Sequence, residues 1–166
     1  MWKHGDDDYR PTFSAARTWD QLRFKRTKVE WSRMVWFAQG VPRYFFITWL
    51  AVRNRLSTED RMRDWGIMQG CELCGERDET RDHLFFACPY SYTIWEPLAR
   101  QLVGRNINLD WHWTVNRLQQ MGGKSLDYIF AKMMFQTIVY HIWRERNARR
   151  RQQNWTSIDQ LRRRID

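Results

Sequence analysis

Residues 71–88 read CELCGERDETRDHLFFAC and contain all three cysteines of the 166-residue chain. A Cys-x2-Cys pair comes first, then eight residues and a histidine, then four residues and the last cysteine. Three thiolates and one imidazole satisfy the tetrahedral preference of Zn²⁺. Because four protein ligands close the coordination shell, the sequence predicts one structural zinc ion, bound by Cys71, Cys74, His83 and Cys88.

Two other interpretations of the cysteines stay open. The thiols could be buried beside a core histidine without a metal, or Cys71 and Cys74 could form a disulfide. A disulfide would leave Cys88 unpaired, and nothing else in the sequence indicates an oxidising compartment. Gly75 directly follows the pair and permits the positive φ of a tight turn, so a metal-binding knuckle is favoured.

Further segments stand in a fixed order around the cysteines. They are FFITWLAVRNRLSTEDRMRDWGI (45–67), Glu79-Thr80, HLFF (83–86), Cys88-Pro89 and Ile94-Trp95. This ordered set resembles the zinc-binding domain that follows the reverse transcriptase in plant LINE-type (non-LTR) retrotransposons. The resemblance covers residues 9–102, and VYHIWRERNARR (139–150) resembles the segment that often follows this domain. It implies a non-catalytic zinc-binding module of retrotransposon origin, which contacts nucleic acid beside a polymerase.

Positive charge is concentrated at the two ends of the chain. The formal net charge is +9, with +5 in residues 1–66, −1 in residues 67–143 and +5 in residues 144–166. Such a distribution suits a polyanionic partner, most simply RNA or DNA. The candidate contacts are Arg144, Arg146, Arg149, Arg150 and Arg151 in a C-terminal helix, and Arg23, Lys25 and Arg26 at the end of the first helix. The predicted zinc segment (residues 71–88) carries five acids and two arginines, so we expect it to repel phosphate.

The basic residues also have plainer interpretations, as caps of helix ends, a solvated helix or a nuclear-import signal. An alternative function is a zinc-stabilised protein–protein interaction scaffold that docks on a polymerase or another partner. The acidic zinc segment and the 11 tryptophans favour this alternative.

Several classes of protein are not expected from this sequence. The usual catalytic motif of a reverse transcriptase and a ribonuclease H carboxylate set are missing, so we expect neither an enzyme nor a small-molecule substrate. No apolar run reaches the roughly 18–20 residues that a membrane span needs. The N-terminus is polar and acidic, unlike a signal peptide, so we expect an intracellular protein, and its origin suggests the nucleus.

The expected fold is mainly α, an irregular helical domain with a zinc-knuckle-like Cys3His loop. A short N-terminal β-hairpin is expected around residues 5–8 (GDDD). The expected helices cover about 14–26, 30–38, 42–55, 59–65, 89–103, 111–121, 126–151 and 157–165. The helix at 42–55 is apolar on nearly every side and is therefore assigned to the core. Phe85 and Phe86 could stack on bases, but on a helical turn they are expected in the core. The large core side chains outside the cysteine segment are expected to include Trp36, Phe46, Trp49, Phe130 and Trp143.

Three parts are expected along the chain. A zinc-binding domain occupies residues 9–102, a helical extension at 103–152 packs on it, and a basic tail follows at 153–166. The apolar stripe of the long helix stops after Trp143. We therefore expect the end of that helix to project into solvent as a basic rod.

Overall fold

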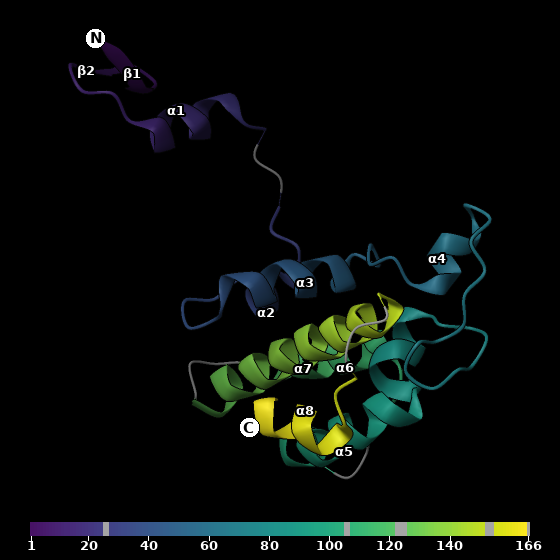
Figure 1. Cartoon of the computed structure of the whole chain (residues 1–166). Helices are drawn as coiled ribbons and strands as arrows, with labels where there is room; N and C mark the ends of the chain where they lie inside the picture. Colours follow the sequence, from purple (N-terminus) through teal and green to yellow (C-terminus); the bar gives the residue numbers. More distant parts are fainter. Residues whose placement is uncertain (25–26, 105–106, 122–125, 152–154, 166) are drawn as a thin grey trace.

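The computed structural model describes residues 1–24, 27–104, 107–121, 126–151 and 155–165, and it is mainly helical (Figure 1). The elements are β1 (Trp2–Gly5), β2 (Asp8–Arg10), α1 (Ala15–Leu22), α2 (Ser32–Val35), α3 (Pro42–Val52), α4 (Glu59–Arg63), the π-helical turn η1 (His83–Ala87), α5 (Pro89–Val103), α6 (Trp111–Gln120), α7 (Leu126–Arg150) and α8 (Ile158–Ile165). The predicted fold class is confirmed. Among the described helices, none combines the length and the apolar composition that a membrane span requires.

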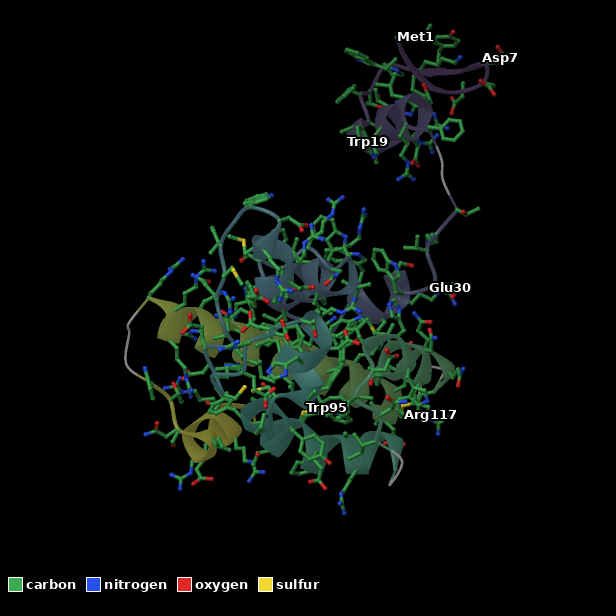
Figure 2. All side chains as sticks on the ribbon, turned by 90° about the vertical axis from the view of Figure 1, so that its right-hand side faces the viewer. Met1, Asp7, Trp19, Glu30, Trp95 and Arg117 are labelled. Carbon is green, nitrogen blue, oxygen red and sulfur yellow. The ribbon has the colours of Figure 1, made fainter. Side chains whose placement is uncertain are left out.

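The N-terminal elements form a small unit of their own. Strands β1 and β2 pair antiparallel, with Trp2 opposite Arg10, which confirms the predicted hairpin. The Ser14 side chain caps α1 by accepting a hydrogen bond from a backbone N–H of its first turn. Gln21 in α1 donates a hydrogen bond to the carbonyl of Lys3, so the helix is fastened to β1. The helices α2 to α8, together with η1, form the helical body. The N-terminal unit stands apart from this body in both views (Figures 1 and 2).

The core of the helical body is an aromatic cluster supported by α7. Phe85 and Phe86 from η1, Trp95 from α5, Trp111 from α6 and Phe135 from α7 are all almost completely buried. Their rings lie 5.1 to 6.1 Å apart, centroid to centroid, in tilted or edge-on pairs. Aromatic pairs favour these arrangements over a face-to-face sandwich. The two phenylalanines come from the C-terminal part of the zinc segment, so that segment is part of the core.

Three of the five expected core side chains lie outside the core. Trp36, Phe46 and Phe130 are 50%, 53% and 58% exposed, whereas Trp49 and Trp143 are partly buried and pack against the core. Although α3 is apolar on nearly every side, it packs on α7 along one face, and its fully buried side chains are small. A helix on the outside of a body buries only the stripe that meets its neighbour, whatever its other faces carry.

The C-terminal part also differs from expectation. The end of α7 is not a free rod, because Glu145 and Arg146 are buried. The helix expected at residues 157–165 is present as α8, and it packs on α5 and α7 with Leu161 and Ile165 buried. An ion pair between Arg146 and Glu79 provides the polar partners that let charged residues of α7 leave solvent.

Two phenylalanines of α7 provide a matched test of this core. Phe135→Ala should lower the free energy of unfolding by about 3–5 kcal/mol, because a buried ring leaves a cavity. Phe130→Ala, at an exposed position of the same helix, should change it by about 0.5 kcal/mol or less. Denaturant titration followed by circular dichroism measures both values. Similar losses in the two variants would contradict the assignment of the core.

Candidate metal centre

The three thiols and the imidazole converge, as the sequence predicts. The ligand atoms of Cys71, Cys74, His83 and Cys88 all lie within 4.8 Å of one another. The Sγ atoms of Cys71 and Cys88 are 3.9 Å apart, and Sγ of Cys74 lies 3.3 Å from Nε2 of His83. Ligand atoms about 2.0–2.3 Å from a tetrahedral zinc would be roughly 3.3–3.8 Å apart, which fits these two distances. All three cysteines are free, so the disulfide interpretation is wrong.

The first two ligands lie on a tight knuckle closed by backbone hydrogen bonds. The N–H of Gly75 donates to the carbonyl of Cys71 over 2.7 Å, and the N–H of Cys71 donates to the carbonyl of Glu76 over 2.6 Å. Gly75 has a φ of +84°, a backbone conformation that residues other than glycine rarely adopt. Gly70 is required for space, because a Cβ there would lie 2.9 Å from the carbonyl oxygen of Glu76.

The other two ligands lie at the ends of the π-helical turn η1. The N–H of Cys88 donates to the carbonyl of His83 over 2.7 Å, which closes the wide i→i+5 turn. The side chains between the two ligands, Leu84 to Phe86, are buried in the core. The prediction that the two phenylalanines are core residues is confirmed. One turn therefore presents ligands to the metal site and apolar groups to the helical body.

The protonation of the thiols indicates a site that favours a cation. The pKa of Cys88 falls to about 4, first because the Cys71 thiol donates a hydrogen bond to it, and further through His83 and backbone N–H groups at the start of α5. The hydrogen bond to Cys88, together with burial, raises the pKa of Cys71. The Cys88 thiolate likewise raises the pKa of His83. A divalent metal ion can take the place of the proton that Cys71 and Cys88 share, because thiolates and neutral imidazole are the ligand forms.

A carboxylate lies behind the histidine. Nδ1 of His83 is 3.4 Å from Oε2 of Glu76, while Nε2 faces the Cys74 sulfur. A histidine that binds a metal through one nitrogen usually donates the other N–H to such a group, which fixes its orientation. Glu76 follows the knuckle directly, but its sequence position alone carries no signal of this role.

A buried ion pair fastens the zinc segment to α7. Arg146 donates to Glu79 through Nη2 over 2.6 Å and through Nε over 3.1 Å. Both side chains are 0% exposed. The prediction of Arg146 as a nucleic-acid contact is therefore wrong, because its guanidinium is enclosed by protein and neutralised by Glu79.

A second arginine of α7 holds the knuckle. Nη1 of Arg149 donates to the carbonyl of Leu73 over 3.2 Å, and Nε donates to Glu145 over 3.0 Å. Its guanidinium also stacks over the rings of Tyr90 and Trp155, 4.4 and 5.1 Å from their centroids. Arg149 thus connects the metal site, α5 and the segment before α8, so most of its donors are already used.

The far end of the zinc segment is anchored to other helices. A carboxylate oxygen of Asp82 accepts a hydrogen bond from the N–H of Trp111 over 3.1 Å, at the start of α6. The Arg81 guanidinium lies 4.8 Å from the Trp111 ring centroid and donates to the carbonyl of Ala51 in α3. Although the segment is acidic, Glu79, Arg81 and Asp82 are therefore engaged in contacts with the helical body.

The remaining predicted nucleic-acid contacts lie in two separate parts of the molecule. Arg144 is exposed on α7, Arg150 is half-buried at its last position, and Arg151 is exposed directly after the helix. Arg23 is exposed after α1 and pairs with Asp20 over 2.6 Å. Residues 25 and 26 (Lys25 and Arg26) lie outside the described residues. The pairing of Arg146 with Glu79 was missed because no local pattern links residues so far apart in the sequence.

Comparison with known proteins gives one family match. The family model described as zinc-binding in reverse transcriptase matches residues 13–95, half of the chain, and the match includes all four residues of the Cys3His cluster. Neither the curated proteins nor the solved structures include a match to this chain.

Two histidines test the metal site. Purified wild-type protein should contain about one zinc ion per chain. His83→Ala and Cys74→Ser should lose it, because each removes a ligand, whereas His112→Ala, at an exposed position of α6, should keep it. Metal analysis after dialysis against a weak chelator measures the difference. Equal zinc content in all the variants would refute the assignment of these ligands.

Two arginines of α7 test the buried ion pair. Arg146→Ala should lower the free energy of unfolding by about 3–5 kcal/mol, because it leaves the Glu79 charge buried without a partner. Arg144→Ala, which removes an exposed cation of the same helix, should cost about 0.5 kcal/mol or less. Replacing both Glu79 and Arg146 with leucine should recover most of the loss in denaturant titration. A double variant no more stable than Arg146→Ala would argue that packing, rather than charge, explains the effect.

Proposed function

Because the chain belongs to the family of zinc-binding domains of reverse transcriptases, we propose that it is a non-catalytic, zinc-stabilised module that contacts nucleic acid. The Cys3His cluster of residues 71–88 is assigned as the ligand set of one structural zinc ion. The zinc segment provides the fixed part of the module, and basic surfaces of the helical body provide the contacts.

The ligand set supports a structural role for the metal. Three thiolates and one imidazole fill a tetrahedral shell, which leaves no position for a water molecule or a substrate. Much of the cluster is also buried, since Cys71 and Cys88 are almost inaccessible to solvent and η1 packs into the core. A metal in such a place stabilises the arrangement of its ligands instead of performing chemistry.

The observation that carries the nucleic-acid proposal is a group of exposed arginines near the C-terminal end. Arg144 on α7, Arg151 directly after that helix, and Arg163 and Arg164 on α8 are all exposed. Helices α7 and α8 pack on each other, so these cations belong to one part of the molecule. A concentration of positive charge of this kind attracts the phosphate backbone. The acidic zinc segment is expected to stay out of the contact.

We extend the proposal to the evolutionary origin of the chain and to its location in the cell. The ordered segments around the cysteines favour an origin in plant LINE-type retrotransposons and action in the nucleus, where such elements meet their target DNA. The proposed organisation is a zinc-binding domain at residues 9–102, an extension at 103–152 that packs on it, and a C-terminal segment at 153–166.

A scaffold that docks on a polymerase or another protein is the second candidate function. Exposed apolar side chains favour it. Trp65 and Met68, between α4 and the knuckle, are 78% and 80% exposed, and Trp36 and Phe46 are half exposed. Large apolar side chains that stay exposed often mark protein interaction sites.

Binding to RNA, single-stranded DNA and duplex DNA over a series of salt concentrations tests the first function against the second. Wild-type protein should bind with a log affinity that falls linearly with log salt, because phosphate contacts release counterions. The double variant Trp65→Ala, Met68→Ala should bind nucleic acid as the wild type does. Absence of binding by wild-type protein, even at low salt, would refute the nucleic-acid function and leave the scaffold.

A further inference from the structure

A groove of about 790 Å³ runs beside the C-terminal half of α7. It is lined by residues of α7 between Tyr140 and Ala148, by Arg151 directly after that helix, by Trp155 and residues of α8, and by Ile47 of α3. In Figure 1, α8 lies alongside α7. The groove lies outside the Cys3His cluster, and none of its lining residues is a metal ligand.

Three cations line this groove. They are Arg144 from α7, Arg151 directly after that helix, and Arg164 from α8. Within the part of the chain that the structure describes, none of the three guanidinium groups forms an ion pair or a hydrogen bond. Two of them act on the same buried side chain: burial first, and then Arg144 and Arg164, lower the pKa of His141. The positive potential therefore reaches the wall of the groove.

The acid in the groove is already neutralised. Glu145 lines it, but this carboxylate accepts hydrogen bonds from Arg149 over 3.0 Å and from the N–H of Thr156 over 2.9 Å. The charge of Glu145 is thus balanced by Arg149, which other contacts also hold in place. The three groove arginines keep their charge available for an anionic ligand.

An exposed aromatic ring stands beside these cations. Trp155 lines the groove and is 74% exposed. Its position is fixed by Arg149, whose guanidinium lies 5.1 Å from the ring centroid. Because Arg149 also binds the carbonyl of Leu73 in the knuckle, the zinc segment helps to position the ring. Proteins that bind single-stranded nucleic acids combine these two features in one groove. The cations contact the phosphates, and the aromatic ring stacks on a base.

We propose that this groove binds a single-stranded nucleic acid, with Arg144, Arg151 and Arg164 on its phosphates and Trp155 stacked on a base. The inference rests on the proposed nucleic-acid function and names its site and its ligand class. A duplex keeps its bases stacked on each other and cannot offer their faces to the ring, so single strands are preferred.

The charge arm of the test compares two triple variants of the full zinc-loaded chain. Arg144→Gln, Arg151→Gln and Arg164→Gln remove the groove cations, while Arg33→Gln, Arg55→Gln and Arg117→Gln remove three exposed cations elsewhere on the helical body. Fluorescence anisotropy with labelled oligouridine and oligothymidine gives affinity against salt. The groove variant should flatten the log–log slope by about 2, at about 0.7 for each lost phosphate contact on single strands.

The stacking arm compares two exposed tryptophans. Trp155→Ala should weaken binding of the single strands roughly five-fold to a hundred-fold, with little change in the salt slope, because it removes stacking and leaves the charges. Trp155→Tyr should restore most of the affinity. Trp65→Ala, which removes a similarly exposed ring beside α4, should bind as the wild type does. Zinc content and helical signal, measured for each protein, identify any variant that misfolds.

The outcomes separate this inference from the broader function. If wild-type protein binds single strands but both triple variants lose the same affinity, the contact is diffuse and the groove assignment is wrong. Equal affinity for a duplex of the same sequence, or displacement of the RNA by polyglutamate at the same charge concentration, would also overturn it, the latter in favour of an acidic protein segment. Failure of wild-type protein to bind any nucleic acid would refute the proposed function itself. If the groove triple variant misfolds, the three single substitutions replace it, each with an expected slope change of about 0.7.

Discussion

The buried ion pair between Glu79 and Arg146 is the contact on which the arrangement of the zinc segment depends. Both groups are withdrawn from water, and their hydrogen bonds join the middle of the segment to the C-terminal half of α7. Desolvating two charges is costly, and an enclosed pair is kept only when the geometry satisfies both partners. The pair therefore does more to define where the segment sits than to add stability. With this position fixed, the knuckle and η1 can meet on either side of the metal site.

The metal centre and the hydrophobic core share the same turn of chain. In η1, His83 and Cys88 face the other ligands, while Phe85 and Phe86 lie against Trp95 and Trp111. Small zinc domains without a core unfold when the metal leaves. Here the aromatic cluster also holds the turn from the opposite side. Metal binding and core packing thus stabilise the same backbone conformation. Each lowers the conformational entropy that the other must offset.

Arginines of the C-terminal helices have two different roles, although they are close together in the sequence. Arg146 and Arg149 are bound to acids and carbonyls of the protein, whereas Arg144 and Arg151 keep their charge at the surface. The helical repeat explains the difference, because residues three apart lie on one face and neighbours do not. The face of α7 toward the zinc segment meets Glu79 and the knuckle. The face toward α8 borders the groove, where the one acid among the described lining residues, Glu145, is already paired with Arg149.

Local chemistry in the sequence determined the ligand set, the hairpin, most of the helix bounds and the burial of Phe85 and Phe86. Cysteine spacing, a glycine after the knuckle, the Ser14 cap of α1 and the proline at the start of α5 act within a few residues, so a single sequence carries them. Only the tertiary structure decided which apolar side chains form the core, since Phe130 and Phe135 have the same chemistry on the same helix and differ only in what packs against them. It also decided which arginines are enclosed, because the partner of Arg146 is 67 residues away and no periodic pattern connects the two. Contacts between distant segments are set by how the helices pack, and that information is spread over the whole chain.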